Sequence, residues 1–307
     1  MRMLVTGGAG FVGSHVVDRL VAAGHAVGVV DDLSTGQRQN VNPAATLHVC
    51  DIRSPELARV VEEVRPHAIA HLAAQAAVPR SVEDPQFDAA VNILGTINLL
   101  EAGRAAGTER VVYISTGGAA YGDATVVPTP EDYPTHAISP YGVSKVTAER
   151  YLECWAGLAP MTGMSLRLAN VYGPRQRSEG EAGVVAIFVQ RLLSGKRCTI
   201  YGDGEQTRDY VYVGDVAEAV LSALTRDVGG VVNVATARET SVNALHGLLC
   251  AALGLSREPE YAPARPGDVV RSALANARAR AVLEWVPQTP LEHGLTATVE
   301  AMRSLTP

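Results

Sequence analysis

The stretch MLVTGGAGFVG, residues 3–13, decides the fold of this 307-residue chain. It indicates a short apolar strand over residues 3–6, then a glycine-rich turn, then an amphipathic helix that ends at Gly24. The glycines at 7, 8, 10 and 13 fit both G-x-G-x-x-G and G-x-x-G-x-x-G. Only glycine lets the backbone come close to a pyrophosphate, which then lies at the positive end of the helix. Strand, turn and helix therefore come in the order that a dinucleotide site requires.

A second apolar strand, residues 26–30, ends at Asp31. An acidic residue about 20 positions beyond the glycines is where the hydroxyls of an adenosine ribose need a hydrogen-bond acceptor. Because a carboxylate would repel a 2′-phosphate, the sequence favours NAD over NADP. Arg38 lies close enough in the sequence to keep NADP as an alternative.

Apolar strands and helical segments continue to alternate, at least five times in all, which predicts a parallel sheet with right-handed crossovers. We expect an α/β fold: a Rossmann-type doubly wound parallel sheet with a smaller C-terminal α/β substrate-binding lobe. Residues 1–169 would form the NAD-binding domain, to which the chain returns near 209–240. Residues 170–307 would mainly form the lobe, with short, irregular elements. The main segments expected are strands over 46–50, 68–74, 111–115, 165–168 and 208–213, and helices over 84–107 and 184–193.

The bulk composition excludes several classes of protein. A net charge of −6 and a pI of about 5.8 disfavour nucleic-acid binding, and 47% hydrophobic residues suffice for a large core. The four cysteines, at 50, 154, 198 and 250, lie far apart. We interpret them as buried thiols of a reducing compartment, with disulfides or zinc as a minor alternative. The first apolar run is interrupted by glycines and charges, so it fits neither a signal peptide nor a membrane span, and a cytoplasmic protein is expected.

The segment YGVSK, residues 141–145, is the strongest catalytic candidate. Pro140 suits the first position of a helix, and a spacing of four places Tyr141 and Lys145 on one side of it. An ammonium within roughly 4–6 Å of a phenol favours the phenolate, which could then act as a base. The chain has only two lysines, 145 and 196, so a lysine here suggests a need for the compact ammonium. By itself the pattern is common on exposed helices.

Other polar residues allow two interpretations each. The loop after the strand over 111–115 could bring Ser115 or Thr116 to the Tyr141 phenol, or it could be an ordinary turn. His71 could be a catalytic acid, but a packed histidine is the interpretation we prefer. Arg208 and Arg265 could clamp a diphosphate, although each could equally be a solvated surface residue.

Six longer motifs together resemble the extended short-chain dehydrogenase/reductase family, in its UDP-glucose (UDP-galactose) 4-epimerase-like branch, from about Met3 to Val299. The resemblance implies a tightly held NAD, a UDP-sugar substrate and a homodimer built from helices around 84–106 and 141–157. No metal is expected, and the charge and the interrupted apolar run already argue against a nucleic-acid or membrane partner. The motifs are VTGGAGFVGSH at 5–15, HLAAQAAV at 71–78, YGVSK at 141–145, ANVYGPRQ at 169–176, GDGEQTRDYVYVGDVAEA at 202–219 and RPGDV at 265–269.

The resemblance also implies roles for single residues. Tyr141 would be the base, Lys145 its electrostatic partner and ribose ligand, and Thr116 the second hydroxyl. The candidate cofactor residues are Gly7, Gly10, Phe11, Val12, Gly13, Asp31, Asp32, Asp51, Ile52, Leu72, Ala73, Ala74, Gln75, Asn92, Ser115, Tyr141 and Lys145. The candidate substrate residues are Thr116, Tyr141, Asn170, Val185, Tyr201, Arg208, Arg265, Asp268 and Ser272.

The sequence departs from the family pattern at Gly117, where relatives usually carry Ser or Thr. Thr116 is the nearest replacement, Ser115 is a second, and loss of the function is a third. Sugar dehydratases carry Asp-Glu at the next two positions, and related decarboxylases keep an acid there. This chain has Gly118 and Ala119, which argues for epimerisation and against dehydration.

The hypothesis is an NAD-dependent epimerase that interconverts UDP-glucose and UDP-galactose by Tyr-assisted oxidation at C4, rotation of a 4-keto intermediate and re-reduction. Ser272, at the position where relatives control room for an N-acetyl group, predicts that the N-acetylhexosamine pair is accepted too. The alternatives are another nucleotide-sugar dehydratase or reductase of the family, and a non-catalytic NAD-binding regulator, which would need neither Tyr141 nor Lys145.

Overall fold

A seven-stranded sheet forms the centre of the computed structural model, which describes residues 1–177, 183–265 and 269–304. All its strand pairs are parallel, in the order β11-β6-β5-β4-β1-β2-β3. The predicted Rossmann-type α/β fold is confirmed. The strands are β1 Arg2–Thr6, β2 Ala26–Asp31, β3 Thr46–Val49, β4 Ala68–His71, β5 Arg110–Thr116, β6 Thr162–Leu168 and β11 Gly230–Val234.

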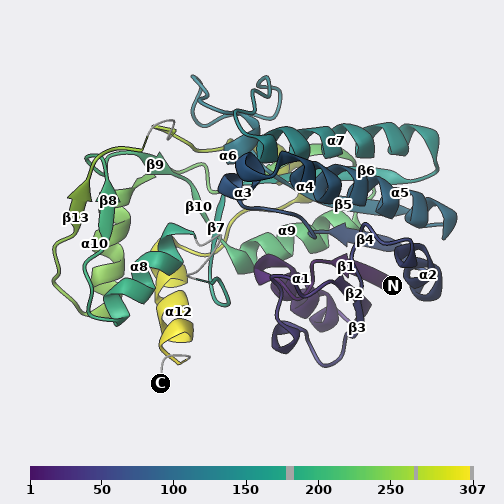
Figure 1. Cartoon of the computed structure of the whole chain (residues 1–307), viewed down its shortest axis with the longest axis horizontal. Coiled ribbons are helices and arrows are strands. Elements are labelled where there is room, and N and C mark those ends of the chain that lie inside the picture. The colour runs from purple at the N-terminus through teal and green to yellow at the C-terminus, as the bar shows by residue number, and fades with distance from the viewer. Residues whose placement is uncertain (178–182, 266–268, 305–307) are drawn as a thin grey trace.

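Helices cover both faces of this sheet (Figure 1). One face packs against α1 (Phe11–Ala22), α9 (Val213–Thr225) and α11 (Ala277–Leu283). The other packs against α2 (Glu56–Val64), α5 (Gly95–Ala105) and α7 (Pro140–Leu158). Successive residues of β5 alternate between the two cores, because side chains of a strand point to opposite faces.

The C-terminal lobe lies beside the carboxyl ends of the sheet strands and has its own core (Figure 1). Its strands form three pairs: β7 (Asn170–Tyr172) with β10 (Tyr210–Tyr212), β9 (Thr207–Arg208) with β12 (Thr240–Ser241), and β8 (Thr199–Tyr201) with β13 (Glu260–Ala262). Its helices are α8 Val184–Leu193, α10 Val242–Leu253 and α12 Leu291–Arg303. The remaining short elements are η1 Arg38–Asn40, α3 Val78–Glu83, α4 Pro85–Ala89, η2 Ala90–Leu94 and α6 Gly117–Ala120.

Some predicted elements differ in the structure. The strand expected over 208–213 is interrupted at Asp209, whose buried carboxylate accepts hydrogen bonds from the amides of Thr236 and Ala237. The single helix expected over 84–107 contains a π-helical turn, η2, between α4 and α5. The lobe strands are short as predicted, but the expectation of short helices was wrong, since α12 has 13 residues.

The cysteine prediction was correct for three of the four residues. Cys50, Cys198 and Cys250 are buried free thiols, whereas Cys154 is exposed on α7. In the described part of the chain, no group of three or more potential metal-ligating side chains comes together. No described helix has both the length and the apolar character needed to cross a membrane.

Candidate functional site

The glycine loop brings the start of α1 tightly against the neighbouring strands. Gly7 has a φ of +70°, and a Cβ there would lie 2.6 Å from the Ala73 amide nitrogen. A Cβ on Gly13 would lie only 2.0 Å from the Gly7 carbonyl oxygen. The α1 helix has no side-chain cap and no acidic residue in its first turn, so its first amides, from Phe11 to Gly13, can donate to an anion. The loop therefore fits a pyrophosphate.

Asp31 lies at the end of β2 beside this loop and is 7% exposed. Its two carboxylate oxygens accept hydrogen bonds at 2.9 Å from the amides of Ala9 and Leu33. Burial raises the pKa of the carboxyl group, and these amide bonds partly counter that effect. Each oxygen keeps a lone pair, so the fixed carboxylate can accept from ribose hydroxyls. Asp32 and Arg38 are both exposed nearby.

Two further candidate cofactor residues, Asp51 and Ile52, have protein partners. The side chain of Asp51 pairs with Arg53 at 2.5 Å, and this hydrogen bond lowers the pKa of the Asp51 carboxyl group. Ile52 is buried, and its carbonyl accepts a 2.7 Å bond from Asn98. In the structure the Asp51 carboxylate is thus already paired with an arginine.

The loop that follows β4 contains Leu72, Ala73, Ala74 and Gln75, and hydrogen bonds from Asn92 hold it in place. The amide of Asn92, on the π-helical turn η2, exchanges two 2.9 Å bonds with the backbone of Gln75. Asn92 also donates to Asp88 at 3.1 Å and to Ser144 of α7 at 3.0 Å. Since these bonds occupy its amide, Asn92 supports the loop and joins it to α7.

Tyr141 and Lys145 lie in the first turns of α7, which Ser139 caps and Pro140 begins. The Lys145 Nζ lies 4.2 Å from the centre of the Tyr113 ring. Burial raises the pKa of Tyr113, and the neighbouring Tyr141 raises it further. Lys145 therefore lies on the buried side of α7, and the spacing of four places Tyr141 on the same side of the helix.

Lys145 is only 4% exposed. Burial lowers the pKa of its ammonium to about 7, and the negative charges of Glu149 and Asp88 oppose that shift. Both carboxylates are buried themselves, and Glu149 binds Arg167 through two hydrogen bonds. We had not predicted Glu149 or Asp88, although the spacing of four between Lys145 and Glu149 was a signal.

The two candidate hydroxyls differ in their surroundings. Ser115 is 4% exposed, and its Oγ has no hydrogen-bond partner. It shares a strand face with Tyr113, whose hydroxyl is buried and unpartnered too. Thr116 caps α6 by accepting a 3.3 Å bond from the Ala119 amide, and its own proton remains free to donate. The half-buried Thr116 hydroxyl can therefore donate to a ligand, whereas the Ser115 Oγ is enclosed and has no partner in the protein.

His71 is packed, as predicted. Its Nδ1 lies 2.7 Å from the Thr6 hydroxyl and its Nε2 lies 3.0 Å from the Thr96 hydroxyl. Burial lowers the pKa of the imidazole to about 3, so the ring is neutral at physiological pH. His71 therefore links β1 to α5.

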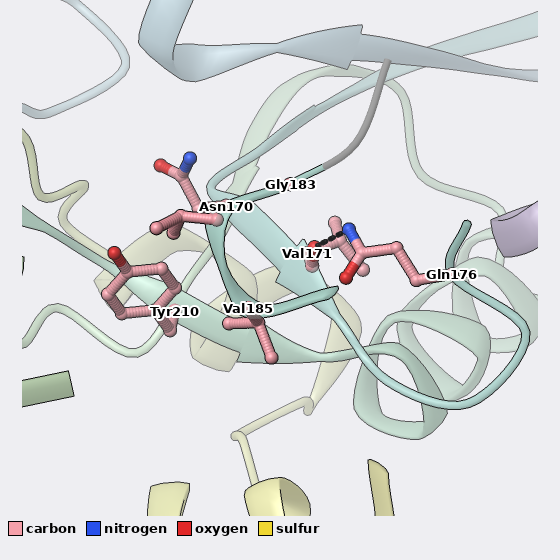
Figure 2. A pocket seen from close by; sticks show the side chains of 7 residues that line it. Asn170, Val171, Gln176, Gly183, Val185 and Tyr210 are labelled. Atoms are coloured by element: carbon pink, nitrogen blue, oxygen red, sulfur yellow. Dashed lines mark hydrogen bonds between the residues drawn. The ribbon is translucent and has the colours of Figure 1, made fainter. Parts of the chain in front are cut away.

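On the lobe side, Asn170 of β7 pairs with Tyr210 of β10. They line a small cavity of about 20 Å³ together with Val185 of α8, and Figure 2 shows these three side chains around it. The Tyr210 hydroxyl and the Gln176 Oε1 are buried without partners. Such a cavity has room for about one water molecule and marks where β7, β10 and α8 meet.

The two candidate arginines lie on neighbouring lobe segments. Arg208 is half-buried, and its Nη1 donates to the carbonyls of Thr207 and Val269 at 2.8 and 2.7 Å. The exposed Arg265 places its guanidinium 3.9 Å from the centre of the Tyr201 ring. Ser272 is half-buried, and its amide donates to the Thr207 carbonyl. The remaining candidate, Asp268, lies outside the described residues.

Solved structures and curated sequences provide full-length matches. The chain is 48% identical over 310 residues to UDP-glucose 4-epimerase of Mycolicibacterium smegmatis, covering 99% of each. It matches the UDP-glucose 4-epimerase of Thermotoga maritima, solved with UDP-glucose, with a TM-score of 0.97, 47% identity and 100% of both chains covered. The corresponding enzyme of Thermus thermophilus, solved with NAD, gives a TM-score of 0.93, 44% identity and 99% coverage of both chains.

The model of the NAD dependent epimerase/dehydratase family matches residues 3–235, which include every strand of the central sheet and both members of the Tyr141–Lys145 pair. The predicted family resemblance is confirmed. The chain belongs to the NAD dependent epimerase/dehydratase family.

Proposed function

We propose that this protein is an NAD-dependent isomerase that interconverts UDP-glucose and UDP-galactose by inverting C4 of the sugar. The observation that carries the proposal is its full-length likeness to the Thermotoga maritima UDP-glucose 4-epimerase, at 47% identity and a TM-score of 0.97. The local geometry supports this: the glycine loop follows β1, Asp31 ends β2 and the Tyr141–Lys145 pair lies on α7 after β5, in a parallel sheet whose ligands bind at the carboxyl ends of the strands.

The residues present suit NAD. The first amides of α1 would hold the pyrophosphate, and Asp31 would accept from the adenosine ribose. The buried Ser115 hydroxyl, which lacks a partner in the protein, supports a polar ligand group above β5. Bound there, NAD would supply reversible hydride transfer at C4 of the sugar, and no cofactor would be consumed.

Tyr141 would take the proton of the C4 hydroxyl and later give it back. It can do so near neutral pH only if positive charge stabilises its phenolate, and Lys145 is the cation on the same side of α7. Burial works against the Lys145 charge, and we infer that the carboxylates of Asp88 and Glu149 help to keep it protonated. Thr116 would donate the second hydrogen bond to the reacting oxygen, with Ser115 as the alternative.

The lobe would hold the nucleotide and leave the sugar free to turn. Arg208 and Arg265 would bind the diphosphate, Tyr201 would support Arg265, and Asn170 with Val185 would border the nucleotide or sugar. The small Ser272 side chain would admit an N-acetyl group at C2. We therefore propose that the N-acetylhexosamine pair is also a substrate.

Three further features belong to this proposal. The NAD-binding domain would comprise residues 1–169 with a return near 209–240, and residues 170–307 would mainly form the substrate lobe. The pairing of β11 with β6 and the separate lobe core support that division. A cytoplasmic homodimer would form through the helices around 84–106 and 141–157, and the exposed Leu94 and Val143 in these ranges support an apolar contact.

The test is incubation with UDP-, dTDP- and GDP-sugars without added NAD, with the products separated by chromatography. We expect UDP-glucose and UDP-galactose to interconvert with no net change in absorbance near about 340 nm, because the cofactor is regenerated in each cycle. A stoichiometric absorbance change would indicate a reductase or dehydrogenase. Loss of water from the sugar would indicate a dehydratase, and binding without turnover a regulator.

A further inference from the structure

The α6 turn is held between two close contacts. On one side, a Cβ on Gly117 would lie 2.2 Å from Cδ1 of Leu274 and 2.9 Å from its Cδ2. On the other, a Cβ on Gly142 of α7 would lie 2.4 Å from the Ala119 carbonyl oxygen. The turn therefore has little room to move toward either neighbour. The missing side chain at residue 117 also has a physical reason, since Leu274 fills that space.

Leu274, which lies against the α6 turn, is itself held in place by its own contacts. Leu274 is 2% exposed and packs with Tyr121 and Ala235. Its amide donates to the buried Asp209 carboxylate at 3.3 Å. The carbonyl before it and the amide after it bond to the backbone of Thr129 at 2.8 and 2.9 Å. A change of Leu274 rotamer would have to disturb this packing, so Leu274 cannot easily move away from Gly117.

The turn carries the groups that must meet at the sugar. Thr116 is the cap of α6, and its hydroxyl accepts from the Ala119 amide within the turn. The Ala119 carbonyl touches the residue that follows Tyr141. Any shift of α6 would therefore change the position of the Thr116 hydroxyl relative to the phenol, and a misplacement of 1 Å can cost about 100-fold in rate.

We propose that Leu274 is a positioning residue for the epimerase reaction: it fills the space beside Gly117 and so fixes Thr116 against Tyr141. The inference rests on the proposed function. The segment 269–275, to which Leu274 belongs, also contacts the substrate side. The Val269 carbonyl accepts from Arg208, and the Ser272 amide donates to the strand that carries Arg208. One segment of chain thus joins the proposed diphosphate clamp to the catalytic turn.

The first test compares Leu274→Ala with Leu249→Ala, a matched control at a fully buried leucine in the lobe core. Leu274→Ala should lower kcat by about 10–100-fold. It should leave KM for UDP-glucose within about threefold, since binding of the ground state is unchanged. With substrate deuterated at C4 the isotope effect on kcat should rise, because chemistry becomes limiting. Leu274→Met, which conserves volume, should restore most of kcat, and Leu249→Ala should lower only stability.

Two further measurements separate this inference from the proposed function. Hydrogen exchange of residues 116–121 should accelerate in Leu274→Ala but not in Leu249→Ala, whatever the substrate is. As a single variant, Gly117→Ala should lower kcat. In the double variant with Leu274→Ala it should lower kcat less, since the new methyl group then has space. Equal kcat values for Leu274→Ala and Leu249→Ala would overturn the proposal, even with faster exchange. If the wild-type protein is inactive on UDP-sugars, the proposed function fails instead. Even then, an unchanged hydrogen-exchange rate of residues 116–121 in Leu274→Ala would show that Leu274 does not support α6.

Discussion

The proposed site has a cofactor side and a substrate side, and the two are built in different ways. The cofactor side consists of strands of four to seven residues in one parallel sheet, and it presents mostly backbone amides, small residues and a buried carboxylate. The substrate side consists of paired strands of two or three residues, and it presents long side chains such as Arg208 and Arg265. A rigid sheet suits a cofactor that stays in place. Long side chains on short strands suit a substrate that must be held at one end while its sugar turns.

The largest expected effect is at Tyr141, the proposed base. Tyr141→Phe should lower kcat by about 10²–10⁴-fold, because it removes the proposed general base. Bound NAD and the melting temperature should stay near the wild-type values, since the ring remains. Chromatographic assay of UDP-galactose formation and extraction of NAD from the purified protein measure the two quantities. Turnover close to the wild-type rate would exclude the phenol as the base.

The second prediction tests the cofactor side. Gly13→Ala should weaken NAD retention by about 10–100-fold, the cost of forcing a methyl group into packed backbone. The new Cβ would lie 2.0 Å from the Gly7 carbonyl oxygen and 2.9 Å from the Gly8 Cα.

The matched control is Gly157→Ala in α7, in the same half of the molecule, where nothing lies within 4 Å of a new Cβ. The amount of NAD per protein after gel filtration distinguishes the variants. If Gly13→Ala and Gly157→Ala retain equal NAD, the close approach of the glycine loop is not what holds the cofactor.

The same contrast explains what could be predicted from the sequence. The sheet and the glycine loop follow from local patterns: alternating apolar segments, glycines at fixed spacing and Asp31 after β2. The pairs β9–β12 and β8–β13 join residues far apart in the chain, so no local pattern reveals them.

At the site, a spacing of four indicated the Tyr141–Lys145 pair. Two other features depend on tertiary packing and have no local pattern. Asn92 and Asp88 form hydrogen bonds with Gln75, and Leu274 fills the space beside Gly117. Sequence alone could detect only that Gly117 departs from the family pattern, without the reason.

The third prediction tests the substrate side. Arg265→Ala should raise KM for UDP-glucose by about 10-fold with kcat nearly unchanged, because the proposed charge-assisted hydrogen bond to the diphosphate would act equally on ground and transition states. Steady-state kinetics measure both constants. Lys196→Ala, at an exposed lysine in the same lobe, is the control for loss of one positive charge. A large fall in kcat with constant KM would assign Arg265 to the chemistry instead of to binding.

The smallest effect concerns Gly247, in the middle of the lobe helix α10. It is exposed, its φ is not positive, and nothing lies within 4 Å of a new Cβ. Gly247→Ala should therefore stabilise the protein by about 0.5–1 kcal/mol, because alanine loses less backbone freedom in a helix. Thermal unfolding should show a rise of about 1–3 °C. The same substitution that disrupts the glycine loop at residue 13 should thus help here, since only the space around the glycine differs. A fall in melting temperature would mean that the lobe helix is as tightly constrained as the cofactor loop, and the contrast between the two sides would fail.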